Sequence, residues 1–358
     1  MTRNYMILHG ESNMFDFDKE KLEGYIQKLK DPRVLIIGDM GIDEMVYGDT
    51  ERISREAPVL ILRHSNTKII LGQAANAAHN LAAINGGKVS AIGLYGSDHH
   101  GPMLLDAFKK AGINTEFMVQ DPLRPTTVKS RISGASFHSV TQQIVRIDRL
   151  DTSAPSKEIE DKIIENIEKA VPLHDAVILS DYNIGLLTDR VIEATVACAK
   201  HHGKIVVADV QKDMFRYKGV YALTPNQPDS EKAAGYFIKD AQTLNRAGSD
   251  ILEMTDAQVL LLTRGGDGMA VFEKGKSEHV DVPVFNKTSV FDVTGAGDTV
   301  VASFTLALAA GAPPKYAAII GNIAASIVIR SFGCATTSIE QIQASLNKMN
   351  MENYTIKV

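Results

Sequence analysis

The 358-residue chain has only two cysteines and no tryptophan. Cys198 and Cys334 lie far apart, and neither belongs to a C-x-x-C motif or has clustered histidines beside it. This pattern argues against a disulfide framework and against a cysteine-based metal site. Because such cysteine usage is typical of a reducing compartment, we predict a cytoplasmic location.

Long apolar runs and basic blocks are also missing. No stretch approaches the roughly 20 apolar residues that a membrane-spanning helix needs, and the N-terminus lacks the basic-then-apolar pattern of a secretory signal. The formal net charge is -5, without a long Lys/Arg block. We therefore expect neither a membrane nor a nucleic acid as a partner.

Apolar runs and helical patterns alternate from residue 33 onward. Short Val/Ile/Leu runs at 34–37, 176–179, 205–208 and 259–262 are typical of buried parallel strands, and stretches with helical periodicity separate them. The alternation predicts an α/β fold with a doubly wound, mostly parallel sheet. Two segments, about 44–71 and 124–148, show strand-like alternation without helices, and we expect them to pair as a small β-sheet lid.

The most informative motif reads Phe-Asp-Val-Thr-Gly-Ala-Gly-Asp-Thr over residues 291–299, and an apolar, alanine-rich stretch follows it. A glycine-rich turn that opens a helix directs several N–H groups and the positive end of the helix dipole at one point, which suits a phosphate. Asp298 adds a carboxylate that can take a proton from a hydroxyl attacking that phosphate. The motif indicates phosphoryl transfer to an alcohol; a plain turn before a helix is the alternative.

Polar residues also follow the ends of earlier predicted strands, where open α/β sheets bind ligands. Asp43, Asp181 and Asp209 are expected at the same edge of one sheet, where their carboxylates can accept hydrogen bonds from sugar hydroxyls. Gly72 lets the backbone approach a ligand at a helix start, and Asn76 offers both a donor and an acceptor. The alternative for each polar side chain is a turn or a helix cap.

Two later strand ends carry groups that suit a nucleotide. Asn226 and Asp229, three residues apart at a strand-to-helix junction, can hold water around a magnesium ion on nucleotide phosphates. A turn asparagine followed by an acid in the first helical turn is the alternative. Thr263, Gly265 and Gly268 close another strand in a way that suits phosphate, although Gly-Asp-Gly also makes tight hairpins.

Taken in order over about residues 33–345, these motifs resemble the ribokinase family, also called the phosphofructokinase B family of carbohydrate kinases. The D-x-x-G-A-G-D string at 292–298 is the signature of that family. The runs at 48–59, 142–148 and 180–182 look most like the branch that phosphorylates D-glycero-β-D-manno-heptose 7-phosphate on the route to ADP-heptose.

The resemblance implies a ribokinase-like sugar kinase that uses ATP and Mg²⁺ and forms a homodimer through its lid. Asp298 would be the base, and Gly295, Ala296 and Gly297 would form the anion hole for the transferring phosphate. The sugar would contact Asp43, Gly72, Asn76, Asp181 and Asp209. ATP would lie along Asn226, Thr263, Gly265, Gly268 and Asn322, with magnesium held through water by Asn226 and Asp229.

Three cations in the second lid segment, Lys129, Arg131 and Arg146, are candidates for the phosphate already on the sugar, since a dianion needs fixed cations. A solvated strand face is the alternative. Because the first residues are polar and mixed and precede the first strong strand signal, we divide the chain into an N-terminal extension (1–32), a kinase domain (33–348) and a tail (349–358). We expect no room within these residues for the nucleotidyltransferase domain of bifunctional heptose enzymes.

The chain departs from the family pattern at several places. Gln73 replaces the second glycine of the substrate loop, and Asp229 replaces the usual glutamate. Ile184 and the pair Val210-Gln211 stand where heptose kinases often have lysine and proline-lysine. Because two phosphate-binding cations are thus missing, a kinase for another sugar or a nucleoside and a non-catalytic sugar-binding protein stay open as alternatives.

Overall fold

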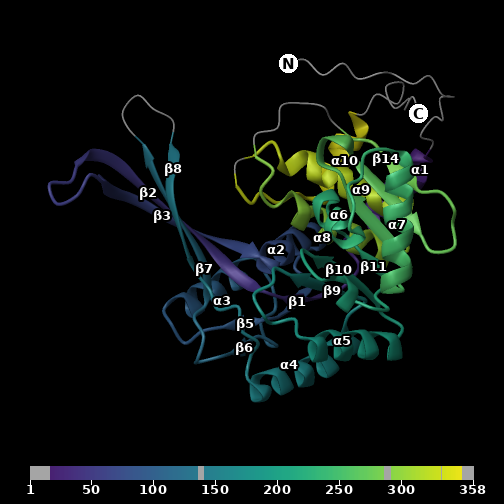
Figure 1. Ribbon diagram of the computed structural model, residues 1–358, viewed down its shortest axis with the longest axis horizontal. Coiled ribbons are helices and arrows are strands. Elements are labelled where there is room, and N and C mark those ends of the chain that lie inside the picture. The colour runs from purple at the N-terminus through teal and green to yellow at the C-terminus, as the bar shows by residue number, and fades with distance from the viewer. Residues whose placement is uncertain (1–16, 136–140, 286–291, 332, 349–358) are drawn as a thin grey trace.

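The computed structural model describes residues 17–135, 141–285, 292–331 and 333–348. The predicted tail at 349–358 and residues 1–16 of the predicted extension lie outside the described residues. A large sheet runs through the body of the molecule, and a smaller sheet projects away from it (Figure 1).

The large sheet has eight strands in the order β14-β13-β12-β11-β10-β9-β1-β4. The six strands β4, β1, β9, β10, β11 and β12 run parallel to one another. Strands β13 and β14 add antiparallel pairs at one edge. The bounds are β1 (Val34–Gly38), β4 (Val89–Ile92), β9 (Ala176–Asp181), β10 (Ile205–Val210), β11 (Ala222–Leu223), β12 (Val259–Thr263), β13 (Met269–Glu273) and β14 (Val280–Val282).

Helices cover both faces of this sheet because successive strand residues point to opposite sides. In β1, Val34 and Ile36 belong to one buried cluster, whereas Leu35 and Ile37 belong to the other. The first cluster packs against α1 (Lys19–Lys28), α2 (Ala74–Asn85), α3 (His100–Lys110), α8 (Ala296–Ala309), α9 (Pro314–Val328) and α10 (Ile339–Asn347). The second packs against α4 (Lys157–Ala170), α5 (Asp189–His201) and α7 (Ala241–Thr255).

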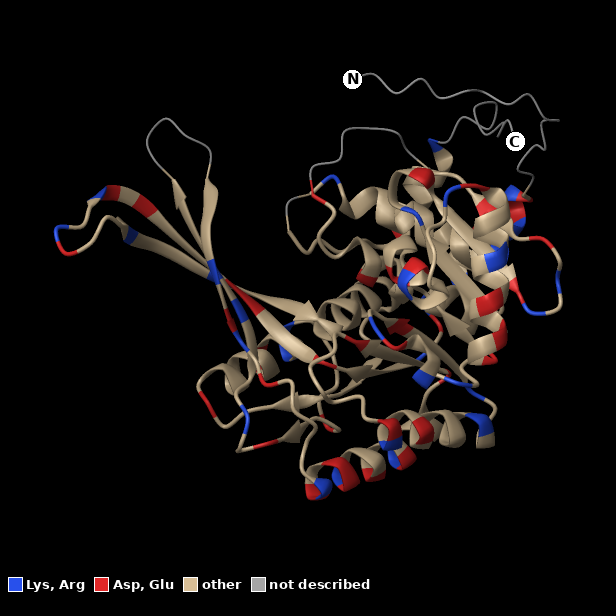
Figure 2. Ribbon diagram, in the orientation of Figure 1, with Lys and Arg blue, Asp and Glu red and all other residues tan. Residues whose placement is uncertain are grey.

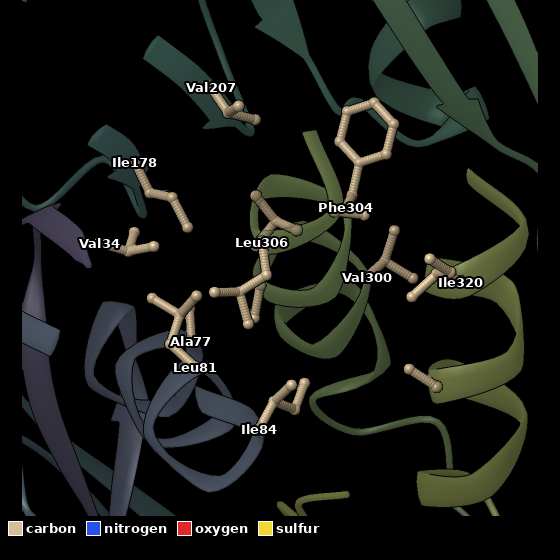
Figure 3. Close-up of a cluster of buried hydrophobic side chains, with 14 of the residues drawn as sticks. Val34, Ala77, Leu81, Ile84, Ile178, Val207, Val300, Phe304, Leu306 and Ile320 are labelled. Atoms are coloured by element: carbon tan, nitrogen blue, oxygen red, sulfur yellow. The ribbon is translucent and has the colours of Figure 1, made fainter. Parts of the chain in front are cut away.

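Figure 3 shows the first cluster, in which Val34, Ile178 and Val207 from the sheet face side chains of α2 and α8. The remaining elements are short: α6 (Gln227–Ala234), the paired strands β5 (Leu94–Tyr95) and β6 (Val119–Gln120), and the 3-10 turns at Val171–Leu173, Met214–Arg216 and Gly265–Asp267. The predicted doubly wound, mostly parallel fold is confirmed. No helix in the described ranges is long and apolar enough to cross a membrane.

Helix α1 lies within the segment that the sequence analysis placed outside the kinase domain. Its residues Leu22 and Ile26 have no exposed surface and belong to the same buried cluster as α9 and α10. Asp18 caps the helix, since its carboxylate accepts a hydrogen bond from the Lys21 N–H at 3.1 Å. The described part of the predicted extension therefore contributes to the core.

The projecting sheet has the order β3-β2-β7-β8 and is formed by β2 (Met40–Ile53), β3 (Leu60–Gln73), β7 (Thr127–Ala135) and β8 (Gln142–Arg149). Its strands extend beyond the body, and basic and acidic residues are interspersed along them (Figure 2). This sheet, called the lid below, confirms the predicted pairing of the two helix-free segments.

The lid begins earlier than predicted. Only Asp39 separates the end of β1 at Gly38 from the start of β2 at Met40. Asp43 consequently lies inside the lid sheet, paired with Ile70 of β3 and Lys129 of β7. The expectation that Asp43 shares one edge of one sheet with Asp181 and Asp209 was wrong, because the chain changes sheets directly after β1.

Candidate active site

The predicted anion site is the start of α8. Gly295 precedes the helix at φ 78°, a left-handed backbone angle that favours glycine, and a Cβ there would lie 2.7 Å from the Asn76 side-chain nitrogen. Gly297 and Asp298 lie in the first turn, where N–H groups have no partner within the helix, whereas the Ala296 N–H donates to the Val293 carbonyl oxygen at 3.2 Å. The sequence motif thus places an anion site and a carboxylate together.

Asp298 is 6% exposed, and both of its oxygens accept hydrogen bonds. The Asn76 amide nitrogen donates to Oδ2 at 2.6 Å, and the Tyr182 hydroxyl donates to Oδ1 at 2.7 Å. Burial raises the pKa of Asp298 to about 6, although these two hydrogen bonds oppose the rise. The carboxylate is therefore held in one orientation and is mostly ionised near neutral pH.

Asn76 is itself fixed by a buried network between α2 and α8. Asn80 donates to the Asn76 carbonyl oxygen at 3.0 Å, and the Thr299 hydroxyl donates to the Asn80 side-chain oxygen at 2.8 Å. All three residues are fully buried. The helix-capping alternative for Asn76 is not what the structure shows, since α2 has no side-chain cap and the amide reaches the carboxylate of Asp298.

Tyr182 was not among the predicted site residues. Burial and the neighbouring Asp298 raise its pKa well above the usual range, so the phenol stays protonated and remains a donor. Lys129 of the lid lies over the Tyr182 ring, with Nζ 5.6 Å from the ring centre. Tyr182 therefore links the carboxylate in the core to a cation in the lid.

The loop that carries Tyr182 is held by Asp39, which sequence reasoning also missed. The Asp39 carboxylate accepts hydrogen bonds from the backbone N–H groups of Tyr182, Ile184 and Leu186 at 3.0 to 3.3 Å. Burial raises the pKa of Asp39 to about 6. Ile184, where a lysine was expected by resemblance, is buried at 6% exposure and points no charge at the site.

Asp181, predicted to bind sugar, is occupied by structural hydrogen bonds. Its Oδ2 accepts from the buried Tyr217 hydroxyl at 2.5 Å, and its Oδ1 accepts from the Asn183 N–H at 2.7 Å. Asp181 is 5% exposed and does not line the pocket beside Asp298. In this structure it shapes the loop after β9, while its substrate role stays an untested prediction.

A pocket of about 160 Å³ opens beside Asp298 and brings together residues from five segments of the chain. Asp209 lies in its wall and accepts a hydrogen bond from the Thr224 hydroxyl at 3.0 Å. Burial raises the pKa of Asp209 to about 7, and the Asp298 charge adds to the rise. The other lining residues include Tyr182, Val210, Gln211, Asn226, Asp229, Thr263, Gly295 and Gly297.

The predicted metal residues, Asn226 and Asp229, line this pocket, but each already makes a polar interaction within the protein. The Asn226 side-chain oxygen caps α6 by accepting from the Asp229 N–H at 2.8 Å, and Asp229 pairs with Lys232 at 2.8 Å. Across the described ranges no group of three or more His, Cys, Asp or Glu residues could hold a metal. This donor set fits magnesium that arrives with nucleotide phosphates and keeps several waters, rather than an all-protein cage.

A second pocket of about 390 Å³ adjoins the first and shares Thr263, Gly297 and Val300 with it. Gly265 and Gly268 line it at φ 55° and 84°, and a Cβ at Gly268 would lie 2.2 Å from the Val282 carbonyl oxygen. The pocket has mostly apolar walls, with Met269, Val284, Val293, Ala325 and Ile329 among them. A narrow polar pocket that opens into a wider apolar one suits a nucleotide's phosphates and base.

Asn322 also lines the second pocket, but its amide is engaged with the chain after β14. Its side-chain nitrogen donates to the Pro283 carbonyl oxygen at 2.7 Å, and its oxygen accepts from the Phe285 N–H at 3.2 Å. The predicted residue therefore forms the pocket by holding its wall in place.

The lid presents a charged face toward this site. Residues paired across strands share a face, so Asp43 of β2 lies with Lys129 and Arg131 of β7 and with Arg146 of β8. Arg131 Nη1 is 2.8 Å from Asp43 Oδ2, and Arg146 Nε is 2.9 Å from an oxygen of Asp148. A Cβ at Gly72 would lie 3.0 Å from Asp43 Oδ1, so that glycine makes room for the carboxylate.

Comparisons with known proteins agree with this geometry. Residues 31–342 match the model of the pfkB family of carbohydrate kinases. The chain is 40% identical over 318 residues to the bifunctional protein HldE of Desulfatibacillum aliphaticivorans, and 36% identical over 330 residues to that of Geobacter metallireducens. These matches cover 88% and 92% of the chain but only 63% and 66% of the two relatives.

Solved structures show the same fold at low sequence identity. Arabidopsis thaliana ribokinase complexed with ribose and ATP aligns with a TM-score of 0.66 and 17% identity, covering 88% of this chain and 98% of the ribokinase. Phosphofructokinase-2 from Escherichia coli, in complex with potassium, aligns with a TM-score of 0.70 and 16% identity, covering 89% and 99%. The ribokinase-like fold and the family match together identify the chain as a sugar phosphotransferase that belongs to the pfkB family of carbohydrate kinases.

Proposed function

We propose that this kinase transfers the γ-phosphoryl group of ATP to the anomeric hydroxyl of D-glycero-β-D-manno-heptose 7-phosphate, giving the 1,7-bisphosphate. The observation that carries the choice of a phosphorylated sugar is the set of three cations, Lys129, Arg131 and Arg146, on the lid face that meets Tyr182. The similarity to HldE proteins supports the heptose.

The cations are only partly neutralised by their neighbours. Arg131 Nη1 is close to Asp43, yet it is among the buried nitrogen atoms without a hydrogen bond of good geometry in the described residues. A guanidinium has five N–H donors, so Arg131 and Arg146 retain donors beside their ion pairs. Burial lowers the pKa of Lys129, which indicates an ammonium group that would gain from an added anion.

In the proposed mechanism Asp298 takes the proton from the attacking hydroxyl. Asn76 and Tyr182 orient its carboxylate. The N–H groups of Gly297 and Asp298 at the start of α8 would donate to the transferring phosphoryl group and offset its negative charge. Magnesium bound with ATP would neutralise phosphate charge, with Asn226 and Asp229 as its water-mediated holders. The lid over the acceptor would exclude water and so limit ATP hydrolysis.

The test is ADP release with Mg-ATP across heptose 7-phosphate, fructose 6-phosphate, ribose and adenosine, with Asp298→Asn as the blank. The proposal predicts turnover with heptose 7-phosphate and phosphorylation at C1, detected by ³¹P NMR. Turnover confined to ribose would move the chain to a branch acting on unphosphorylated sugars. Turnover confined to adenosine would identify a nucleoside kinase.

We also propose that the chain forms a homodimer through the lid. Apolar side chains lie exposed on lid strand β8, where Ile144, Val145 and Ile147 are each 45% exposed. Their burial against a second lid would remove this surface from water. Light scattering of the wild type and of Ile147→Lys tests this directly: a monomeric wild type would contradict the proposal.

A further inference from the structure

Gln73 is a departure from the family pattern that the proposed mechanism does not use. It sits where β3 meets α2, at φ 57° and ψ -136°, a backbone conformation that glycine adopts easily and other residues avoid. The chain thus keeps a side chain at a position where glycine would relieve strain. Strain of this kind points to function when the structure shows what the side chain does.

The Gln73 side chain is buried without partners. The residue is 6% exposed, and both Nε2 and Oε1 lack a hydrogen-bond partner in the described residues. A buried carboxamide normally finds partners for its donors and its acceptor, because leaving them unpaired is costly. The unsatisfied nitrogen and oxygen of the Gln73 carboxamide therefore indicate that a ligand supplies their hydrogen-bond partners.

The carboxamide lies on the substrate-facing side of the lid. A Cβ at residue 41 would be 1.9 Å from Gln73 Oε1, so the side chain occupies the space that the absent side chain of Gly41 leaves. Side chains alternate along a strand, and Gly41 therefore shares a face with Asp43. Its partner Thr127 shares that face with Lys129 in the same way.

From this placement we infer that Gln73 is a specificity-determining residue that binds a hydroxyl of the acceptor sugar. A hydroxyl both donates and accepts, and a carboxamide offers the complementary pair of atoms, whereas the neighbouring Asp43 only accepts. Gly41 and Gln73 act as a matched pair, because the missing side chain at one position makes room for the carboxamide of the other. The inference rests on the proposed sugar kinase function.

The experiment compares wild type with Gln73→Gly, using Mg-ATP and heptose 7-phosphate. Loss of one hydrogen bond predicts an acceptor KM about tenfold higher, with the ATP KM changed less than about twofold. The melting temperature should not fall, because glycine suits the backbone angle. Asp256→Gly is the matched control, since Asp256 also has a positive φ (58°) but precedes β12 at the opposite end of the strands.

A second measurement separates binding from a purely structural role. Among monodeoxy heptose 7-phosphates, one position should cost wild type about tenfold in kcat/KM and cost Gln73→Gly less than about twofold. An unchanged acceptor KM, or an unchanged penalty for every deoxy analogue, would overturn the inference while leaving the kinase function intact.

An error in the proposed substrate would show up in the wild type alone, as a lack of turnover with heptose 7-phosphate. If wild type phosphorylates only fructose 6-phosphate or ribose, the variant is compared on that acceptor, and the same tenfold rise in KM supports the role of Gln73. If wild type phosphorylates none of these acceptors, both proposals fall.

Discussion

The start of α8 and the inner face of the lid contribute to the same site in different ways. Around Asp298 the polar groups are buried and already paired with Asn76 and Tyr182. On the lid, both polar atoms of the Gln73 side chain lack a hydrogen-bond partner in the described residues, and Arg131 Nη1 contacts Asp43 without a hydrogen bond of good geometry. The difference suggests that the core is built in advance for phosphoryl transfer, whereas the lid is left incomplete until an acceptor binds.

The sharpest test of the core half is Asp298→Asn. We expect kcat to fall roughly a hundredfold or more, because general base catalysis typically contributes that much, while the acceptor KM changes less than about threefold. Steady-state kinetics with Asp161→Asn, a change on the exposed surface of α4, provides the control. A loss of less than tenfold in kcat would show that Asp298 is not the base.

The lid half is tested by Arg146→Ala. Removing one phosphate-binding cation should raise the KM of a phosphorylated acceptor about tenfold and leave the ATP KM unchanged. Arg149→Ala is the matched control, since Arg149 lies on the same strand but on the opposite face, where it donates to the Ser130 hydroxyl at 2.8 Å. If both changes raised the acceptor KM equally, the phosphate of the acceptor would not bind preferentially to the lid face that carries Arg146.

Tyr182 bridges the two regions, so Tyr182→Phe shows how strongly they are coupled. Its hydrogen bond lowers the pKa of Asp298, and its loss should move the acidic limb of the kcat/KM profile upward by about half to one pH unit. Activity at pH 8 should fall only a few fold. A pH–rate profile that does not shift would indicate that this hydrogen bond does not set the protonation of the base.

The smallest expected effect concerns stability. Asp39, Asp209 and Asp298 have pKa values raised to about 6, 7 and 6, so the folded state binds more protons than the unfolded chain between pH 4 and 7. Their contribution to the free energy of unfolding therefore decreases as pH rises through this window. Asp298→Asn should reduce the drop between pH 5 and 8 by roughly 1 kcal/mol, measured by denaturant unfolding. If the free energy of unfolding fell by the same amount in the wild type and in Asp298→Asn, the raised pKa of Asp298 would be contradicted.

The sequence predicted the core half of the site better than the lid half for a physical reason. Turn, helix start and carboxylate are contiguous in residues 295–298, so local geometry alone brings them together. The partners of Asp298 are 222 and 116 residues away in the chain, and only the folded packing shows those contacts. Asp39 was overlooked because its role depends on N–H groups about 145 positions later.

The lid illustrates the same limit. Strand-like alternation predicted its two segments, but the register that places Lys129 beside Asp43 depends on pairing between distant strands. The anomaly at Gln73 was visible in the sequence as a substitution at a glycine position. Its meaning required the positive φ angle and the two unpaired atoms.

The two ends of the first lid hairpin meet at the body of the protein. The chain leaves the large sheet at Asp39 and returns at Ala74, whose N–H donates to the Asp39 carbonyl oxygen at 3.2 Å. A segment with adjoining ends can be exchanged when the replacement keeps its buried contacts, here Met40, Ile42 and Leu71, and its pairing with β7. Residues 40–73 can therefore be treated as an exchangeable unit. Replacing this hairpin with that of a relative that uses another acceptor offers a route to change the acceptor while Asp298 and the start of α8 stay unchanged.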